Sequence, residues 1–347
     1  MRCAKRWFPA REVRPREQGA GTARRRRVRI RGGRDVGWAH RSLIRMRDLT
    51  AEDIVRILDT AAACKDIFRR AVKKLPTLRG QVMVNLFYEP STRTRTSFEL
   101  AGKWMSADVV NIAVPSSSVV KGESVTDTAR TLAALGADIV VIRHPAAGVP
   151  AMLARSVGAA VINAGDGMHE HPTQALLDIF TIRECRGTLA GLHVLIVGDI
   201  LHSRVARSNI WGLKRLGARV TVAGPPTLIP SGLERLGVGV SHDLDRVLPR
   251  ADVVNVLRIQ RERQTSGLFP SLREYTRLFG LTRERLQLLK PDALILHPGP
   301  ANVGVEIDRE VMDDPRARIE EQVTNGVAVR MAVLYLLMGG RQDAMVA

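Results

Sequence analysis

The chain alternates between short apolar segments and longer segments in which apolar residues recur at helical spacing. Behind Thr50 and Asp53, which have the spacing of a capping box, apolar residues fall on one helical face: Ile54, Ile57, Leu58, Ala61 and Ala62. Residues 81–87 are apolar and β-prone, which is typical of a strand buried in a parallel sheet. The pattern therefore predicts a helix followed by a buried strand.

The same two patterns continue along the rest of the chain. We expect strands at residues 81–87, 108–114, 138–142, 160–163, 192–197, 219–223, 252–257 and 293–296. We expect helices at residues 50–70, 92–105, 124–135, 150–157, 173–185, 204–216, 231–236 and 322–338. Repeated strand–helix units predict an α/β fold of two doubly wound parallel-sheet domains. The 347 residues are enough to bury two hydrophobic cores.

The predicted elements suggest a division of the chain. We expect one domain over residues 42–175 and a second over residues 176–321, joined by the helix near residue 173. The last helix, within residues 322–340, is apolar on most sides and should pack back on the first domain. Ligands of open α/β sheets bind beyond the carboxyl ends of the strands, so we expect the site in a cleft between the domains.

The net charge of +18 is concentrated at the start of the chain. Residues 1–41 carry +11 of it, which leaves +7 for the rest, and they lack apolar periodicity. We therefore expect a disordered basic extension. Three explanations compete: an inert tail translated upstream of a later start such as Met46, a targeting segment, and a basic arm for nucleic acid. We favour the inert tail, because the segment lacks the apolar core of a secretory signal.

Composition narrows the class of protein. Aromatic residues make up 4% of the chain, which argues against base stacking on nucleic acid. No apolar run approaches the roughly 20 residues that span a bilayer, so we expect no membrane partner. Cys3, Cys64 and Cys185 are odd in number and widely spaced, which indicates reduced thiols in a cytoplasmic protein.

Residues 89–99 have the features of a phosphate cradle. They follow the predicted strand 81–87, and Ser91 or Thr92 is a suitable N-cap for the next helix. The N-terminus of a helix offers free N–H groups and a partial positive charge. Hydroxyl and guanidinium groups crowd the same turn: Ser91, Thr92, Arg93, Thr94, Arg95 and Thr96. Such donors suit a phosphate whose negative charge grows as a bond breaks.

Other polar residues follow later predicted strands. Arg143 ends an apolar strand, where a guanidinium should bind either an anion or a structural carboxylate. Lys121 lies in a Ser/Gly loop and suits an anionic ligand, although a solvated lysine is the alternative. His169 and His171 have no third ligand at a suitable spacing, so we expect no metal. The turn after residue 197 lacks the glycines of a dinucleotide site, so we expect no such cofactor.

Six spaced motifs over residues 42–340 resemble the aspartate and ornithine carbamoyltransferase family. Residues 91–96 are similar to its carbamoyl-phosphate signature, and residues 171–174 to its His-Pro-Thr-Gln motif. Residues 121–124 (Lys-Gly-Glu-Ser) and the pair Arg258 and Gln260 resemble the aspartate-type members. The chain departs from the family at Gly299, where Leu is common, and at Val303, where bacterial relatives often have Arg.

The resemblance implies a role for each matched residue. For carbamoyl phosphate it implies these ligands: Ser91, Thr92, Arg93, Thr94, Arg143, His171, Gln174, Ser117, Lys121, Pro298 and Gly299. For aspartate it implies Lys121, Arg204 on the α-carboxylate, and Arg258 with Gln260 on the side-chain carboxylate. The catalytic groups would be Arg93, Thr94, Arg143 and His171. Ser117 and Lys121 would come from a neighbouring subunit of a homotrimer.

The implied reaction is transfer of the carbamoyl group from carbamoyl phosphate to the α-amine of L-aspartate. The products are N-carbamoyl-L-aspartate, a pyrimidine precursor, and phosphate. Catalysis would rest on positioning and electrostatics, with no metal and no cofactor. Ornithine or another amino acid remains an alternative acceptor, and a nucleic-acid-binding protein remains an alternative of a different class. Association with a regulatory chain or a dihydroorotase stays open.

Overall fold

The computed structural model describes residues 38–113, 124–260 and 271–339. Nearly all of the expected basic extension, residues 1–41, lies outside the described residues, as do Ser117 and Lys121. No helix among the described residues combines the length and apolar character that crossing a bilayer requires.

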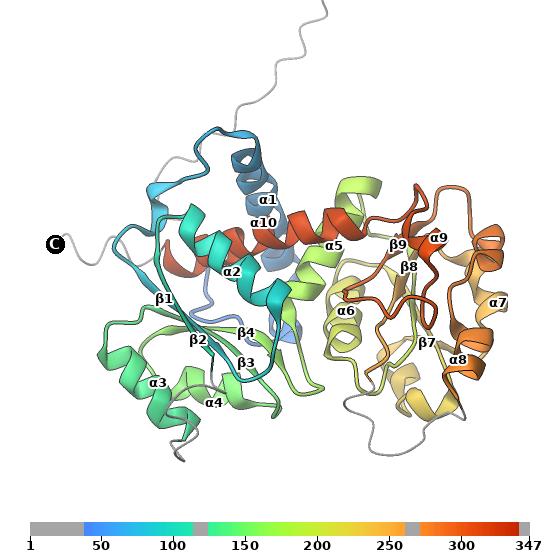
Figure 1. The fold of residues 1–347 in the computed structure, drawn as a ribbon, viewed down its shortest axis with the longest axis horizontal. Helices are drawn as coiled ribbons and strands as arrows, with labels where there is room; N and C mark the ends of the chain where they lie inside the picture. Colours follow the sequence, from blue (N-terminus) through green and yellow to red (C-terminus); the bar gives the residue numbers. More distant parts are fainter. Residues whose placement is uncertain (1–37, 114–123, 261–270, 340–347) are drawn as a thin grey trace, which may run out of the picture. The chain divides into compact units, whose positions relative to one another are not determined.

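Two parallel sheets form the framework of the described chain (Figure 1). The first has the order β2-β1-β3-β4 and contains β1 (Val82–Phe87), β2 (Asp108–Ala113), β3 (Ile139–His144) and β4 (Ala160–Asp166). The second has the order β7-β6-β5-β8-β9 and contains β5 (His193–Val197), β6 (Arg219–Ala223), β7 (Gly239–Ser241), β8 (Val253–Val256) and β9 (Leu294–Leu296). Every strand pair is parallel, which confirms the α/β fold.

Both faces of the first sheet are buried, because successive strand residues point to opposite faces. Val140 and Ile142 of β3 pack toward α3 (Val125–Ala134) and α4 (Val149–Ser156). Ile139 and Val141 belong to the core on the other face, beside α1 (Ala51–Lys65) and α2 (Thr92–Trp104). Helices therefore cover both faces, and the uninterrupted apolar runs that predicted these strands follow from that.

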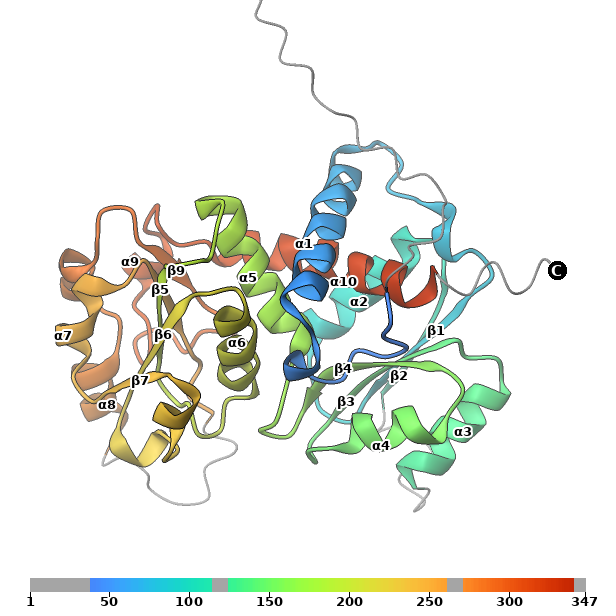
Figure 2. The same cartoon turned by 180° about the vertical axis from the view of Figure 1, so that it is seen from behind.

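The second sheet is covered in the same way (Figure 2). Val194 and Ile196 of β5 share a core with α6 (Arg204–Arg215) and α5 (Pro172–Arg186). Leu195 and Val197 face α7 (Leu244–Val247), α8 (Leu272–Phe279) and α9 (Arg309–Met312). One continuous apolar cluster thus includes residues from both sheets, with α5 in its middle.

The last helix, α10 (Ile319–Met338), packs against α1, α2 and α5, as expected for a helix that is apolar on most sides. Arg330 donates from Nη1 to Ser97 Oγ of α2 at 3.0 Å, and its guanidinium lies 5.0 Å from the Phe98 ring centroid. Asn325 donates to Thr181 Oγ1 of α5 at 3.0 Å. Burial lowers the pKa of Arg330 to about 10, opposed by the Asp178 carboxylate, so the group stays cationic at neutral pH.

The short elements of the second half are where the sequence-based expectation was incomplete. The strand β7 and the helices α7, α8 and α9 were not predicted, and residues 231–236 contain a 3₁₀ helix (Leu233–Leu236) instead of an α-helix. β7, α7, α9 and the 3₁₀ helix have only three or four residues, which is too short to display a hydrophobic period, and α8 is a short helix of eight residues. The helix expected over residues 50–70 ends at Lys65 and continues as a 3₁₀ turn.

Candidate active site

The carboxyl ends of six strands, three from each sheet, open onto one pocket of about 1310 Å³. Its walls include Glu89 after β1, Arg143 at the end of β3 and His171 after β4. From the second sheet come Arg204 after β5 and Arg258 after β8, while residues 297–300 follow β9. In each sheet the strand order changes direction, at β1/β3 and at β5/β8, and ligands bind at such switch points.

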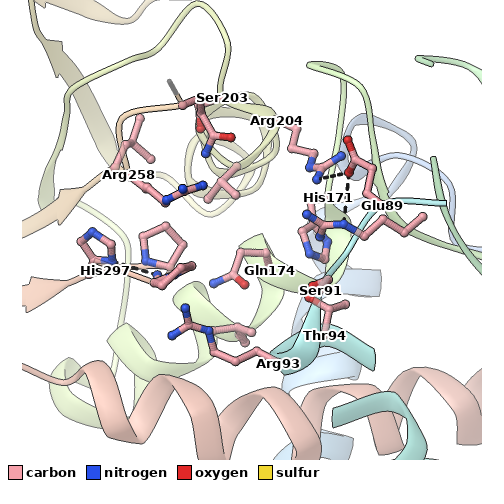
Figure 3. Close-up of a pocket in the computed structure, with 18 of the residues that line it drawn as sticks. Glu89, Ser91, Arg93, Thr94, His171, Gln174, Ser203, Arg204, Arg258 and His297 are labelled. Atoms are coloured by element: carbon pink, nitrogen blue, oxygen red, sulfur yellow. Dashed lines mark hydrogen bonds and ion pairs between the residues drawn. The ribbon is translucent and has the colours of Figure 1, made fainter. Parts of the chain in front are cut away.

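All the predicted site residues that the structure describes line this pocket, part of which is shown in Figure 3. They are Ser91, Thr92, Arg93, Thr94, Arg143, His171, Gln174, Arg204, Arg258, Gln260, Pro298 and Gly299. The two predicted residues that remain, Ser117 and Lys121, lie outside the described residues. The structure therefore brings together residues from Ser91 to Gly299, which are 208 positions apart in sequence.

The first turn of α2 points into the pocket. Ser91 is the N-cap in an extended conformation, and its hydroxyl caps none of the described N–H groups of the helix. Thr94, one turn further, is buried, whereas Thr92 and Arg93 are exposed to the pocket. Hydroxyl, amide and guanidinium donors thus converge where the helix dipole is positive, which suits a dianion.

Arg93 lies against the backbone of Gly299. Gly299 has φ of +60°, and a Cβ at this position would collide with the Arg93 guanidinium. The family's usual Leu would therefore need a different arrangement of Arg93 in this chain. Burial lowers the pKa of Arg93, and the nearby positive charge of Arg258 lowers it further, which indicates a pocket with an excess of cations.

Glu89 binds two of the predicted arginines with one oxygen. Arg143 Nε donates to Glu89 Oε2 at 3.1 Å, and Arg204 Nη2 donates to the same oxygen at 2.7 Å. Arg204 is almost completely buried, with 4% of its side chain exposed. The structural carboxylate considered for Arg143 therefore exists, inside the pocket. The sequence reasoning gave Glu89 no role, although its place between β1 and the helix N-cap was a usable signal.

His171 and Gln174 occupy the start of α5. His171 is the N-cap residue, Pro172 takes the first helical position, and the His171 N–H donates to Ser208 Oγ at 2.8 Å. Gln174 donates from Nε2 to Asp178 Oδ1 at 2.9 Å, one turn along the helix. Both side chains reach the pocket from a helix that is buried almost throughout.

The loop after β9 is held by its own histidine. His297 Nδ1 accepts from the Gly299 N–H at 2.8 Å, which defines this nitrogen as unprotonated, and Nε2 lies 3.3 Å from Glu306 Oε1. The His297 N–H donates to Gln322 Oε1 of α10 at 2.9 Å. These bonds fix the backbone of Pro298 and Gly299 at the pocket wall.

The sequence reasoning also missed Asp178, a fully buried carboxylate behind the pocket. It accepts hydrogen bonds from four side-chain amides, those of Gln174, Gln322, Asn209 and Asn255. Burial raises the pKa of Asp178 to about 6, although the four amide donors act in the opposite direction. Among the described residues, no group of three or more His, Cys, Asp or Glu side chains could hold a metal ion.

Two family models match the chain, one over the strands of the first sheet and the other over the strands of the second sheet. The model for the carbamoyl-P binding domain of aspartate/ornithine carbamoyltransferase matches residues 41–184, and the model for its Asp/Orn binding domain matches residues 190–337. The chain belongs to the aspartate/ornithine carbamoyltransferase family. The resemblance that the six motifs indicated is thereby confirmed.

Relatives within this family are close. The aspartate carbamoyltransferase catalytic subunit of Moorella thermoacetica is 64% identical over 300 residues, covering 86% of this chain and 98% of the relative. The corresponding subunit of Desulforamulus reducens is 63% identical over 308 residues, with 89% and 99% covered. The chain thus spans nearly the whole length of both relatives.

Solved structures of family members share the fold. Aspartate transcarbamoylase from Trypanosoma cruzi in complex with carbamoyl phosphate and aspartate has a TM-score of 0.78 and 32% identity. That match covers 85% of this chain and 95% of the other. The same enzyme with N-(phosphonacetyl)-L-aspartic acid gives a TM-score of 0.79 at 32% identity, with 85% and 94% covered.

Proposed function

We propose that this chain transfers the carbamoyl group of carbamoyl phosphate to the α-amine of L-aspartate, giving N-carbamoyl-L-aspartate and phosphate. The observation that carries the proposal is the arrangement of the pocket. The α2 N-terminus with Arg93 forms one end, and Arg204 and Arg258 reach in from the second sheet. The similarity to the aspartate-type catalytic subunits supports it.

The phosphate end of the substrate is assigned to the first turn of α2. Ser91, Thr92, Arg93 and Thr94 would hold the phosphate oxygens with hydroxyl, amide and guanidinium donors. These donors are fixed by the helix before the reaction begins, so little reorganisation is needed when the phosphate leaves. By family resemblance, Ser117 and Lys121 of a neighbouring subunit would complete this end.

The carbamoyl group is assigned to the centre of the pocket. Thr94, Arg143 and His171 would donate to its carbonyl oxygen, where negative charge develops as the amine attacks. Gln174 and the carbonyls of Pro298 and Gly299 would accept hydrogen bonds from its amino group. Donors on one side and acceptors on the other would fix the orientation of a planar carbamoyl group.

Aspartate is assigned to the part of the pocket beside the second sheet. Arg204 would bind the α-carboxylate, and Arg258 with Gln260 would bind the side-chain carboxylate. The neutral α-amine would then attack the carbamoyl carbon. As the new C–N bond forms, the bond from carbon to the phosphate oxygen breaks, its electron pair stays on phosphate, and phosphate takes up the amine proton.

The assembly and setting are proposed on the same basis. We assign carbamoyl phosphate binding to residues 42–175 with the last helix, and aspartate binding to residues 176–321. The enzyme would work as a cytoplasmic homotrimer in pyrimidine synthesis, with sites shared between subunits. The test is a carbamoylation assay that compares aspartate with ornithine, together with the mass of the native assembly. Preference for ornithine, or no turnover of carbamoyl phosphate, would overturn the proposal.

A further inference from the structure

We infer that Asp178 is a positioning residue that makes the pocket select an acyl phosphate carrying an N–H donor, and reject one carrying a methyl group. The inference rests on the proposed function, because it concerns how the carbamoyl group is distinguished from an acetyl group. Asp178 does not line the pocket, so it would act through the residues to which it is bonded.

The surroundings of Asp178 define its ionised form. Oδ1 accepts from Gln174 Nε2 at 2.9 Å and from Gln322 Nε2 at 2.7 Å. Oδ2 accepts from Asn209 Nδ2 at 2.7 Å and from Asn255 Nδ2 at 3.3 Å. An ionised carboxylate accepts at about four positions and donates at none, so four amide N–H donors satisfy it completely. A protonated carboxyl group would have to displace one of these donors.

This arrangement determines which end of the Gln174 amide is available to a ligand. The two ends of a glutamine amide differ, since nitrogen donates and oxygen accepts. Asp178 holds the nitrogen, which leaves Oε1 as the end that is not tied to the carboxylate. Gln174 lines the pocket between His297 and His171 (Figure 3), so it presents an acceptor to the ligand there.

The same carboxylate acts on the loop after β9. Gln322 Nε2 is bound to Asp178, so its Oε1 is turned to accept the His297 N–H at 2.9 Å. His297 Nδ1 then accepts the Gly299 N–H at 2.8 Å. Pro298 has no N–H, so the wall formed by Pro298 and Gly299 offers carbonyl acceptors. One buried carboxylate therefore orients all three acceptors assigned to the amino group.

The consequence is selectivity by hydrogen bonding. A carbamoyl group supplies two N–H donors to these acceptors, whereas an acetyl group of similar size supplies none. Acceptors that are desolvated and left without a donor disfavour the methyl ligand. If Asp178 loses its charge, Gln174 and Gln322 can turn their amides, and the pocket no longer distinguishes the two groups by this means.

The test uses the full-length protein and the variant Asp178→Asn. The measured quantities are KM for carbamoyl phosphate and the competitive inhibition constants of acetyl phosphate and inorganic phosphate. In the variant we expect KM for carbamoyl phosphate to rise by about 10- to 100-fold, the effect of one or two lost hydrogen bonds. The inhibition constant of inorganic phosphate should change by less than about 3-fold, and that of acetyl phosphate should stay the same or fall, because neither ligand donates an N–H to these acceptors.

The control variant is Asn209→Ala, which removes a donor from Oδ2 and leaves both bonds to Oδ1 in place. The thermal stability of Asn209→Ala should fall. The ratio of KM for carbamoyl phosphate to the inhibition constant of acetyl phosphate should stay unchanged. Should Asp178→Asn fail to fold, Gln322→Met provides the second measurement. That variant frees the His297 N–H, so the same ratio should rise by several-fold.

Equal weakening of all three ligands in Asp178→Asn would overturn the inference, since that result indicates general disruption of the pocket. An unchanged ratio in both Asp178→Asn and Gln322→Met would overturn it as well. These outcomes leave the proposed function intact as long as the unaltered protein makes N-carbamoyl-L-aspartate. If the unaltered protein makes none, the proposed function itself fails.

Discussion

Glu89 and Arg204 are 115 residues apart in sequence, yet Glu89 Oε2 lies 2.7 Å from Arg204 Nη2. Glu89 follows β1 of the first sheet, and Arg204 begins α6 beside the second sheet. The same oxygen accepts from Arg143 Nε at 3.1 Å. Two guanidinium groups in a pocket already rich in cations would repel each other strongly without this carboxylate. Glu89 therefore sets the positions of two arginines that we assign to different substrates.

Replacing Glu89 with Gln should weaken both substrates together. The amide has the shape of the carboxylate, but it cannot balance the charges of Arg143 and Arg204. We expect kcat/KM for each substrate to fall by about 10- to 100-fold, as for loss of one charge-assisted contact. Glu99→Gln is the matched control, since Glu99 pairs with Lys103 on the surface of α2. Steady-state kinetics of both variants measure this effect, and kcat/KM values in Glu89→Gln equal to those of the unaltered protein would contradict the role of Glu89.

Arg258 and Arg93 should separate the two substrates. We expect Arg258→Ala to raise KM for aspartate by about 100-fold, while KM for carbamoyl phosphate changes by less than about 3-fold. Arg93→Ala should do the reverse and also lower kcat, because we assign its guanidinium to the phosphate, the group that gains charge. The assay varies each substrate with the other at saturation. Parallel loss of both affinities in Arg258→Ala would refute the assignment to aspartate.

The positions of the pocket arginines could be predicted because of how parallel sheets are built. Arg143, Arg204 and Arg258 each follow an apolar strand in the sequence, and the carboxyl ends of parallel strands meet at one edge. The first turn of α2, to which we assign the phosphate, could be predicted for a different reason, namely that its residues are consecutive in the sequence. These parts of the site required only the local pattern and the rule for parallel sheets.

The environment of Asp178 could not be predicted in that way. Gln174 is one helical turn away, so that contact is implied by the spacing. Asn209, Asn255 and Gln322 come from α6, β8 and α10, and their convergence depends on how three separate elements pack around α5. A polar residue in a predicted helix gives no sign that it will be completely buried. The contacts of Asp178 with these three residues depend on long-range packing, which a local sequence pattern does not show.

The cysteines should differ sharply in reactivity. Burial raises the pKa of the Cys64 thiol to about 12, so it stays protonated at pH 8, whereas Cys185 is exposed. The thiolate is the reactive form, and its fraction at Cys64 is therefore very small. Iodoacetamide at pH 8 should modify the Cys185 peptide within minutes and the Cys64 peptide only after unfolding. Peptide mapping by mass spectrometry measures both, and early labelling of Cys64 would contradict its burial.

Two truncations should separate the basic extension from the folded chain. Removing residues 1–37 should leave turnover, aspartate KM and thermal stability unchanged, because this basic segment lacks the apolar periodicity of a packed element. Removing residues 1–45 also deletes Leu43, which is buried and pairs with β4: its N–H donates to Val161 O, and its carbonyl accepts from the Asn163 N–H, each at 2.9 Å. Loss of that side chain and its bonds should cost about 2–4 kcal/mol of unfolding free energy.

The shorter truncation also tests the nucleic-acid alternative. If residues 1–37 bind nucleic acid, their removal should abolish the salt-dependent affinity of the protein for a DNA or RNA duplex. An enzyme that does not use the segment would show the same weak binding before and after truncation. Loss of carbamoylation activity in this variant would contradict the view that residues 1–37 are dispensable for catalysis.

The buried Asp178 should make stability depend on pH in a defined window. Burial raises its pKa from the ordinary 3.8 to about 6, so the folded chain binds this proton more tightly than the unfolded chain. The contribution of the group to stability is therefore largest below pH 4, and it decreases as the pH rises to about 6. The difference between the two pKa values corresponds to about 3 kcal/mol.

Urea unfolding of the unaltered protein and of Asp178→Asn at pH 4, 5, 6 and 7 measures this term. Other groups titrate alike in both proteins, so the difference between their unfolding free energies should decrease by up to about 3 kcal/mol between pH 4 and 6 and then remain constant.

Asp252→Asn is the control. Although burial opposes it, hydrogen bonds from the His193 N–H and Lys290 hold the pKa of Asp252 below 3.8. The stabilising effect of the Asp252 carboxylate is lost only below about pH 4. The difference in unfolding free energy between the unaltered protein and Asp252→Asn should therefore not change with pH between pH 4 and 7. If the difference for Asp178→Asn also does not change with pH, the four amide donors lower the pKa of Asp178 as much as burial raises it. The carboxylate would then orient Gln174 without a cost in stability.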